Sequence, residues 1–405
     1  MFNVNDVRND FPMIKNHPDL IYFDNGATTY KPQVVIDAIT KFYTDYTSNV
    51  ERGDYETAIQ ADRAYEEARK CVATLIHSEE KEVVFLSNIT AALNQIAYGL
   101  SKKLNKGDVI LTSKSEHASN LLPWYRLKDN LGVEIKYVNV DDVGRIDIDD
   151  FKNQCDETVK VVTFASVTNV LGTNQPVKEL TKIAHDNGAI VVIDAAQAIG
   201  HQPIDVKDLD VDFLCFSSHK MCGPDGVGVL YGKYNLLDEM DPLLLGGGMN
   251  ARFTSDGKVV LKDAPHKFEA GTPNIEGVIG LSAACKYLMD LGLDNIHAYE
   301  KELRGYMKEK FKELDNVIVY NLENESGPIT FNVKDVFAQD AAGYLAANHI
   351  AVRSGNHCAK ILHEIIGTDQ SVRASLYFYN TKEEVDYFVE KVKEINLESA
   401  IGIFF

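Results

Sequence analysis

The sequence predicts an α/β protein built on a mainly parallel sheet, and two observations support this prediction. Short and almost wholly apolar runs recur along the chain, and amphipathic stretches separate them. Continuous apolar strands are typical of parallel sheets, because helices cover both faces of such a sheet. The pattern changes after about residue 264, where strands and segregated helices indicate a second, smaller α+β domain.

The predicted strands of the large sheet follow one another along the first half of the chain. They lie at residues 83–86, 109–112, 161–165, 190–194 and 213–216, with helices predicted at 90–97 and 120–131. In open α/β sheets, ligands bind beyond the carboxyl ends of the strands. The residues that follow each apolar run are therefore the first candidates for chemistry.

The second half of the chain begins with an irregular, glycine-containing stretch at residues 246–271. Beyond it, the pattern predicts helices at 279–291 and 297–314, a strand at 329–333, and helices at 340–348 and 382–395. We therefore expect an N-terminal segment at residues 1–15, a large domain at 16–264 and a small C-terminal domain at 265–405.

Charge and composition exclude some classes of partner. The chain has 405 residues, and 41 Lys and Arg against 60 Asp and Glu give 41 − 60 = −19. This balance argues against nucleic acid and against an anionic membrane surface as partners, although a local basic site for a small anion remains compatible with it. No apolar run reaches the roughly 18 residues of a spanning helix, and the first ten residues lack a secretory apolar region. We expect a cytoplasmic protein.

Six scattered cysteines form neither a Cys-x-x-Cys pair nor a cluster with histidines. In a reducing compartment this spacing predicts neither a disulfide framework nor a structural metal site. Free cysteines are most often small buried hydrophobic residues, so only a special environment justifies another role. The six are Cys71, Cys155, Cys215, Cys222, Cys285 and Cys358.

The most informative polar residues are Asp194, at the end of one apolar run, and Lys220, just after the next one. A carboxylate at the end of a buried strand is costly unless it meets a cation or a protonated ring nitrogen. Burial lowers the pKa of a lysine, as an imine-forming amine requires. Sites for pyridoxal 5'-phosphate (PLP) combine these two groups. On spacing alone, a structural ion pair between Asp194 and Lys220 is an equally good interpretation.

Four motifs occur in order along the chain. They are Asp194-Ala195-Ala196-Gln197, Ser217-Ser218-His219-Lys220, Glu269-Ala270-Gly271-Thr272-Pro273 and Arg353-Ser354-Gly355-Asn356-His357-Cys358-Ala359. Together they resemble the motifs of class V, fold-type I PLP-dependent enzymes, and most closely those of the SufS-like (group II) cysteine desulfurases. The resemblance extends from residue 22 to residue 375. It implies a large PLP-binding domain with a mainly parallel seven-stranded sheet, and a smaller α+β C-terminal domain.

The resemblance also implies which residues hold the cofactor. Lys220 is implied to join PLP as a Schiff base, Asp194 to keep the pyridine nitrogen protonated, and Gln197 to bond to the phenolic oxygen. His117 is implied to stack on the ring and to act in catalysis. The residues implied to bind the phosphate are Ile89, Thr90, Ser217 and His219, with Thr272 from a second subunit. That last assignment implies a homodimer.

The substrate side of the site is likewise implied by the resemblance. Asn169, Arg353 and Arg373 are implied to surround the carboxylate of L-cysteine, and a bidentate arginine suits that task. Cys358, in a short loop, is implied to take the sulfur as a persulfide while alanine leaves. Its neighbours Arg353 and His357 are expected to favour the thiolate. The sulfur is implied to pass to a SufE- or SufU-like acceptor protein, for iron–sulfur cluster or thio-cofactor assembly.

Several positions depart from the family pattern. Glu51 and Tyr55 replace two histidines in the stretch Val50-Glu51-Arg52-Gly53-Asp54-Tyr55, Asn356 replaces a histidine, and Lys360 stands where glutamine is common. Ile89 removes one hydroxyl from the phosphate loop. These departures keep other functions open: a selenocysteine lyase, another class V lyase or aminotransferase, or a non-catalytic binding module for sulfur transfer.

Overall fold

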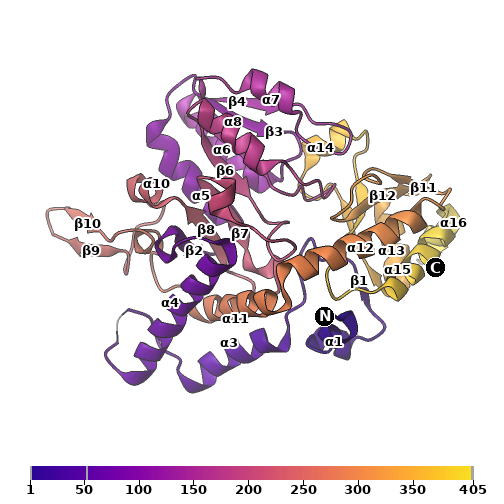
Figure 1. Ribbon diagram of the computed structural model, residues 1–405, viewed down its shortest axis with the longest axis horizontal. Helices are drawn as coiled ribbons and strands as arrows, with labels where there is room; N and C mark the ends of the chain where they lie inside the picture. Colours follow the sequence, from indigo (N-terminus) through magenta and orange to yellow (C-terminus); the bar gives the residue numbers. More distant parts are fainter. Residues whose placement is uncertain (1, 52, 403–405) are drawn as a thin grey trace.

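The computed structural model describes residues 2–51 and 53–402, and a seven-stranded sheet lies at its centre (Figure 1). The strand order is β2-β8-β7-β6-β5-β3-β4. In this sheet β8 runs antiparallel to both of its neighbours, and the other neighbouring pairs are parallel. This confirms the predicted mainly parallel, seven-stranded sheet. The strands are β2 (Val83–Leu86), β3 (Val109–Ser113), β4 (Glu134–Val138), β5 (Val159–Ala165), β6 (Ile190–Asp194), β7 (Phe213–Ser217) and β8 (Gly228–Gly232).

Successive side chains of a strand point to opposite sides of the sheet. A continuous apolar run therefore makes both faces of the sheet apolar. On one face, Val84, Ile110 and Val192 pack with residues of α5 (Ile89–Leu100) and α6 (Leu122–Leu131). On the other face, Val83, Leu111 and Val191 pack with α4 (Glu56–Ile76), α8 (Val177–Asp186) and α11 (Ile275–Leu291). The continuous apolar runs of the sequence are therefore buried from both sides.

The small domain holds a four-stranded antiparallel sheet in the order β11-β12-β15-β14. Its core also contains residues of α12, α13 and α15, as the α+β prediction requires. The strand β1 near the N-terminus pairs in parallel with β13, so the start of the chain is joined to this domain. The elements are β1 (Ile21–Tyr22), α12 (Leu293–Phe311), β11 (Val317–Val319), β12 (Ile329–Val333), α13 (Ala338–Ala347), β13 (Ile350–Ala351), β14 (Arg353–Gly355), β15 (Ser371–Ala374), α15 (Lys382–Glu394) and α16 (Leu397–Gly402).

Two long helices connect the two sheets in sequence. The first, α11, packs against α3 (Gln33–Asp45) and α4, whereas the second, α12, packs against α15 (Figure 1). The division of the chain at residue 264 stays a prediction, and this packing supports a change of core close to Gly292, between the two helices. No helix among the described residues combines the length and the apolar composition that crossing a bilayer requires.

A hairpin formed by β9 (Asn250–Phe253) and β10 (Val259–Leu261) lies in the stretch expected to be irregular, and it projects from the body of the molecule (Figure 1). Its residues Phe253 and Val259 are 71% and 54% exposed. The remaining helices are α1 (Val4–Arg8), α2 (Pro12–Asn16), α7 (Ile148–Gln154), α9 (Val206–Leu209), α10 (Tyr234–Glu239) and α14 (Lys360–Ile365), and the 3₁₀ helices are Glu80–Glu82, Ser101–Lys103, Ala118–Asn120, Ser218–Lys220 and His266–Phe268.

Candidate active site

Asp194 and Lys220 lie at the carboxyl ends of two neighbouring parallel strands. Asp194 is the last residue of β6, is 5% exposed, and accepts a hydrogen bond from the amide of Ala196 at 2.9 Å. Burial raises the pKa of Asp194. Lys220 ends the 3₁₀ helix that follows β7. Burial lowers the pKa of Lys220 to about 8, against the opposing effect of the Asp194 charge. The lysine is therefore partly neutral near neutral pH, as a nucleophilic amine must be.

His117 lies in a loop that faces the same end of the sheet. Its Nδ1 accepts a hydrogen bond from the amide of Ser119 at 3.1 Å, so the neutral ring carries its proton on Nε2. Burial, together with the charges of Lys220 and Arg373, lowers the pKa of His117 to about 4. The ring is neutral at neutral pH, and a neutral flat ring suits stacking on an aromatic cofactor.

Glu116 is a buried acid for which no role was predicted from the sequence. Its two carboxylate oxygens accept hydrogen bonds from Ser113 Oγ at 2.6 Å and from Asn120 Nδ2 at 2.8 Å, and the Asn120 carbonyl in turn accepts from Thr163 Oγ1 at 2.7 Å. Burial raises the pKa of Glu116 to about 7. These bonds fix the loop that carries His117. The sequence pattern that could have identified Glu116 is the one that identified Asp194, namely an acidic residue close to the end of a buried strand.

The N-terminus of α5 lies beside the end of β7 and forms a cradle for an anion. The amide of Ile89 donates to Ser217 Oγ at 2.9 Å, and Thr90 Oγ1 lies 2.8 Å from Ser119 Oγ. Burial and the charges of two lysines lower the pKa of His219 to about 4, so its ring is neutral at neutral pH. Hydroxyl groups and amides at the start of a twelve-residue helix suit a phosphate.

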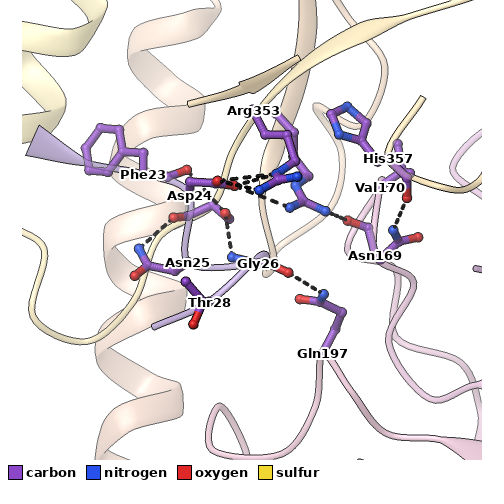
Figure 2. Close-up of polar contacts among 12 residues, drawn as sticks. Phe23, Asp24, Asn25, Gly26, Thr28, Asn169, Val170, Gln197, Arg353 and His357 are labelled. Carbon is purple, nitrogen blue, oxygen red and sulfur yellow. Dashed lines mark hydrogen bonds and ion pairs between the residues drawn. The ribbon is translucent and has the colours of Figure 1, made fainter. Parts of the chain in front are cut away.

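Arg373 and Asn169 form a second polar cluster, and Figure 2 shows Asn169 within it. Arg373 Nη1 donates to the main-chain oxygen of Asn169 at 2.9 Å, and Arg373 Nη2 lies 3.6 Å from Asp24 Oδ1. Burial lowers the pKa of Arg373 to about 10, so the group remains cationic at neutral pH. Arg373 Nε and Asn169 Oδ1 are buried without a hydrogen-bond partner among the described residues. A buried cation with an unused donor is suited to a carboxylate ligand.

Gly26 lies directly against this cluster. A Cβ atom at this position would lie 3.0 Å from Arg373 Nη2 and 3.2 Å from Ser375 Oγ, so glycine allows this close approach without a shift of either side chain. The main-chain oxygen of Gly26 accepts a hydrogen bond from Gln197 Nε2 at 2.9 Å (Figure 2). The side-chain amide keeps a second N–H, so the role of Gln197 at the phenolic oxygen stays a prediction.

Cys358 is the exposed cysteine of the chain, and the other five are buried. Cys358 therefore differs from the other cysteines in exposure, and its role as the sulfur nucleophile stays a prediction. Its main-chain oxygen accepts a hydrogen bond from the amide of Ala118, next to His117, at 2.8 Å. The Cys358 loop of the small domain and the His117 loop of the large domain are therefore in direct contact.

The expected help of His357 to the Cys358 thiolate is wrong. The His357 ring turns into the protein, where it is 8% exposed, and its Nε2 lies 3.1 Å from Ser371 Oγ. Burial and the charge of Arg373 lower the pKa of His357 to about 2, so the ring is uncharged at neutral pH. Arg353 and His357 were both expected to favour the Cys358 thiolate. Of these two residues, Arg353 is the one that carries a positive charge.

Thr272 is set apart from the other predicted residues. It is exposed, and its hydroxyl accepts a weak contact from Asn49 Nδ2 at 3.5 Å. Within the described ranges, no hydrogen bond connects Thr272 to the residues around Lys220. Its loop is anchored by Glu269, which pairs with Arg69 Nη1 at 2.8 Å. Its role in a second subunit's site stays a prediction.

The departures from the family pattern have defined surroundings. Glu51 pairs with Lys262 at 2.5 Å and lies 3.4 Å from His266, and Tyr55 is 58% exposed. Arg52, between them, lies outside the described residues. Asn356 Oδ1 accepts from the amide of Cys358 at 3.1 Å, a side-chain contact that asparagine often makes in turns.

The donor set fits PLP. A buried carboxylate suits a protonated pyridine nitrogen, a half-buried lysine with a lowered pKa suits Schiff-base formation, and the start of α5 suits the phosphate. Fold and site together define a PLP-dependent enzyme with an exposed cysteine at the substrate side.

Known proteins agree with this class. The family called aminotransferase class-V matches residues 21–388. The cysteine desulfurase of Haloferax volcanii is 39% identical over an alignment of 411 positions, which covers 96% of each chain. The apo structure of a cysteine desulfurase from Thermococcus onnurineus NA1 has a TM-score of 0.93 and 41% identity, and it covers 97% of this chain and 98% of its own. The cysteine desulfurase CsdA from Escherichia coli has a TM-score of 0.91 and 33% identity, with coverage of 100% and 99%. The chain belongs to the aminotransferase class-V family, among the cysteine desulfurases.

Proposed function

We propose that this chain is a homodimeric, PLP-dependent cysteine desulfurase that converts L-cysteine to L-alanine and leaves the sulfur as a persulfide on Cys358. One observation carries the proposal. The amide of Ala118 donates a hydrogen bond to the Cys358 carbonyl, so the loop with the exposed thiol contacts the loop of His117, at the end of the sheet that carries the half-buried Lys220 and the buried Asp194. A lysine site for PLP and a nucleophilic thiol are the two parts that sulfur removal from cysteine needs.

The protein groups around the cofactor site each have a defined task. When bound, PLP supplies an electron sink for carbanion chemistry at the substrate α-carbon. The buried Asp194 carboxylate stabilises positive charge at the place of the ring nitrogen. Lys220 Nζ, with its pKa lowered to about 8, takes a proton from the α-carbon and returns one as a general acid. Arg373 Nε, which has no partner among the described residues, holds the substrate carboxylate.

The sulfur step balances without an external oxidant. The Cys358 thiolate attacks the substrate sulfur, so that an S–S bond forms while the Cβ–S bond of the substrate breaks. The electron pair of the broken bond stays on the carbon side, which takes up one proton and becomes the methyl group of alanine. The substrate carbon is reduced while the two sulfurs are oxidised to the persulfide level.

Two features support a homodimer and a protein acceptor. The stretch from Leu244 to Val260 exposes several apolar side chains that a second subunit would cover, among them Leu244 and Leu245, which are 64% and 71% exposed. The exposure of Cys358 leaves its persulfide open to a SufE- or SufU-like acceptor. Delivery of this sulfur in the cytoplasm, for iron–sulfur cluster or thio-cofactor assembly, is part of the same proposal.

The test measures alanine and sulfide after L-cysteine and a reductant are added to the purified holoenzyme. We expect the two products in equal amounts, with both lost in Cys358→Ser and in Lys220→Ala. The matched control is Cys71→Ala, which removes a buried thiol elsewhere in the core and keeps activity. Full sulfur release by Cys358→Ser would overturn the mechanism.

The departures at Glu51, Tyr55 and Asn356 favour one alternative, a related reaction at the same site. A selenocysteine lyase or another class V lyase would prefer selenocysteine or cysteine sulfinate over cysteine, and an aminotransferase would need a keto acid. Assays of these substrates side by side separate the reactions. A non-catalytic sulfur-transfer module would lack the cofactor absorbance that Lys220→Ala removes.

A further inference from the structure

The Cys358 loop has a backbone that needs support. His357 and Cys358 have φ angles of 51° and 58°, in the left-handed region that residues with a side chain seldom adopt. For such residues this region is less favourable than an ordinary conformation, so contacts must hold the two residues there. Local bonds supply part of the support: Asn356 accepts from the amide of Cys358 at 3.1 Å through its side chain, and from that of Ala359 at 2.8 Å through its main chain.

The rest of the support comes from the large domain. The amide of Ala118 donates to the Cys358 carbonyl at 2.8 Å, and Asn169 Nδ2 donates to the His357 carbonyl at 2.8 Å (Figure 2). The second bond is made by a buried side chain, with Asn169 only 9% exposed. A hydrogen bond shielded from water resists opening more than an exposed one does.

Asn169 also contacts the predicted carboxylate site. Its main-chain oxygen accepts from Arg373 Nη1 at 2.9 Å, and its side-chain oxygen has no partner among the described residues. Asn169 therefore lies directly between the arginine that is suited to a carboxylate and the loop that carries the nucleophile. A ligand on Arg373 and the position of Cys358 are joined through a single residue.

We propose that Asn169 is a positioning residue for Cys358: its side-chain N–H holds the His357 carbonyl and thereby fixes the sulfur nucleophile relative to the substrate carboxylate. This inference rests on the proposed function. It goes beyond the implied role of Asn169 as a carboxylate ligand, because the contact that carries it is to the Cys358 loop. A misplacement of about 1 Å costs on the order of 100-fold in rate, so a lost loop contact acts on the sulfur step.

The test compares holoenzyme with Asn169→Ala and Asn169→Asp. The aspartate keeps the size of the side chain but turns a donor into an acceptor. The first readout is amide hydrogen exchange of the peptide containing residues 356–359, without substrate. Loss of one hydrogen bond of about 1 kcal/mol predicts exchange that is about fivefold faster in both variants. The matched control is Asn174→Ala on the same segment, where Nδ2 donates to Ser326 Oγ at 2.9 Å and exchange of this peptide stays unchanged.

The second readout separates positioning from carboxylate binding. At saturating cysteine we expect the single-turnover rate of persulfide formation on Cys358 to fall about 10- to 100-fold. The dissociation constant of L-alanine, followed by the cofactor spectrum, changes less than that rate because Arg373 remains. Unchanged exchange, with a raised KM and an unchanged single-turnover rate, would show that Asn169 is only a carboxylate ligand. If the unaltered enzyme forms no alanine, the proposed function fails, while the exchange experiment still tests the loop contact.

Discussion

The carboxylate of Asp24 lies between two arginines, with Oδ2 3.1 Å from Arg353 Nη2 and Oδ1 3.6 Å from Arg373 Nη2 (Figure 2). Asp24 comes just after β1, and it forms an isolated parallel bridge with Ser375, the residue that follows β15. The side chain of Asp24 is 17% exposed. The aspartate therefore supplies negative charge to two cations that are predicted to bind the substrate carboxylate.

Asp24→Asn is expected to destabilise the enzyme and to increase the benefit of a bound carboxylate. Removal of one partner leaves the buried Arg373 charge less compensated, and the expected loss in the free energy of unfolding is about 1–3 kcal/mol. A ligand such as L-alanine supplies a replacement carboxylate. Thermal unfolding should show a lower Tm in the variant and a larger rise in Tm with L-alanine than in the unaltered enzyme.

Asp45→Asn is the control for this prediction, since it breaks an exposed pair with Lys41 and should shift the Tm little. An equal Tm rise with L-alanine in Asp24→Asn and in the unaltered enzyme would show that Asp24 does not face the carboxylate site.

The sequence predicted the sheet well where strands are buried on both faces. All five predicted strands form, because their apolar runs have no other stable location. The strands outside that series are β4 and β8. The first is an edge strand whose residues Glu134 to Tyr137 are partly or fully exposed, and the second is a buried strand that begins and ends in a glycine, Gly228 and Gly232. Exposure hides the apolar signal of β4, and the glycines of β8 are typical of turns and weaken its strand signal.

The site could be predicted in part, for a related reason. Asp194 and Lys220 follow apolar runs, so the strand-end rule finds them from the sequence. Asp24 contacts Arg353, and Asn169 contacts His357. In each pair the two residues lie almost 200 positions or more apart in the sequence. No local pattern encodes such contacts. The orientation of His357 was predicted wrongly, because adjacency in sequence to Cys358 does not say which way a ring points in a left-handed turn.

Glu269→Ala is predicted to destabilise the protein strongly. Glu269 makes two short contacts with Arg69, at 2.8 and 2.9 Å, and also accepts from the amide of Phe85 at 2.8 Å. Both charged side chains are buried, at 2% and 8% exposure. Removal of one partner of a buried pair costs about 3–5 kcal/mol, because the other charge stays buried without compensation.

Glu66→Ala is the matched control, because Glu66 contacts the same arginine from a side chain that is 49% exposed. Its loss should cost less than about 1 kcal/mol. Urea unfolding of both variants tests the prediction, and equal losses for Glu66 and Glu269 would contradict it.

Acid is predicted to destabilise the enzyme through His357. The pKa of His357 falls from 6.5 to about 2 on folding, so below pH 6.5 the unfolded chain binds a proton that the folded chain does not. Stability from this residue is therefore present above pH 6.5 and is lost as the pH falls, by about 1.4 kcal/mol per pH unit. Urea unfolding of the holoenzyme between pH 7 and pH 5 should show the free energy of unfolding falling with this slope. In His357→Asn the slope should be smaller by the contribution of about one proton.

Ser371→Ala controls for the contact, since it removes the hydroxyl 3.1 Å from His357 Nε2 but leaves the titrating ring. Its slope with pH should match that of the unaltered enzyme. A slope in His357→Asn as steep as in the unaltered enzyme would mean that His357 is protonated in the folded state.

In the absence of the cofactor, Lys220 is predicted to lower the free energy of unfolding. In PLP-free protein its pKa falls from 10.5 to about 8 on folding, because burial disfavours the charged amine. The penalty is complete below pH 8 and disappears as the pH rises to 10.5, since only the unfolded chain keeps the proton between these values. With allowance for the partial exposure of the side chain, the free energy of unfolding of Lys220→Met should be about 2 kcal/mol higher at pH 7.

Lys178→Met, at the surface, should change stability by less than about 0.5 kcal/mol. With PLP present the order should reverse, because the cofactor stabilises only the chain that can bind it through Lys220. A PLP-free Lys220→Met variant no more stable than the unaltered protein at pH 7 would show that the amine is well solvated, which is incompatible with its proposed role.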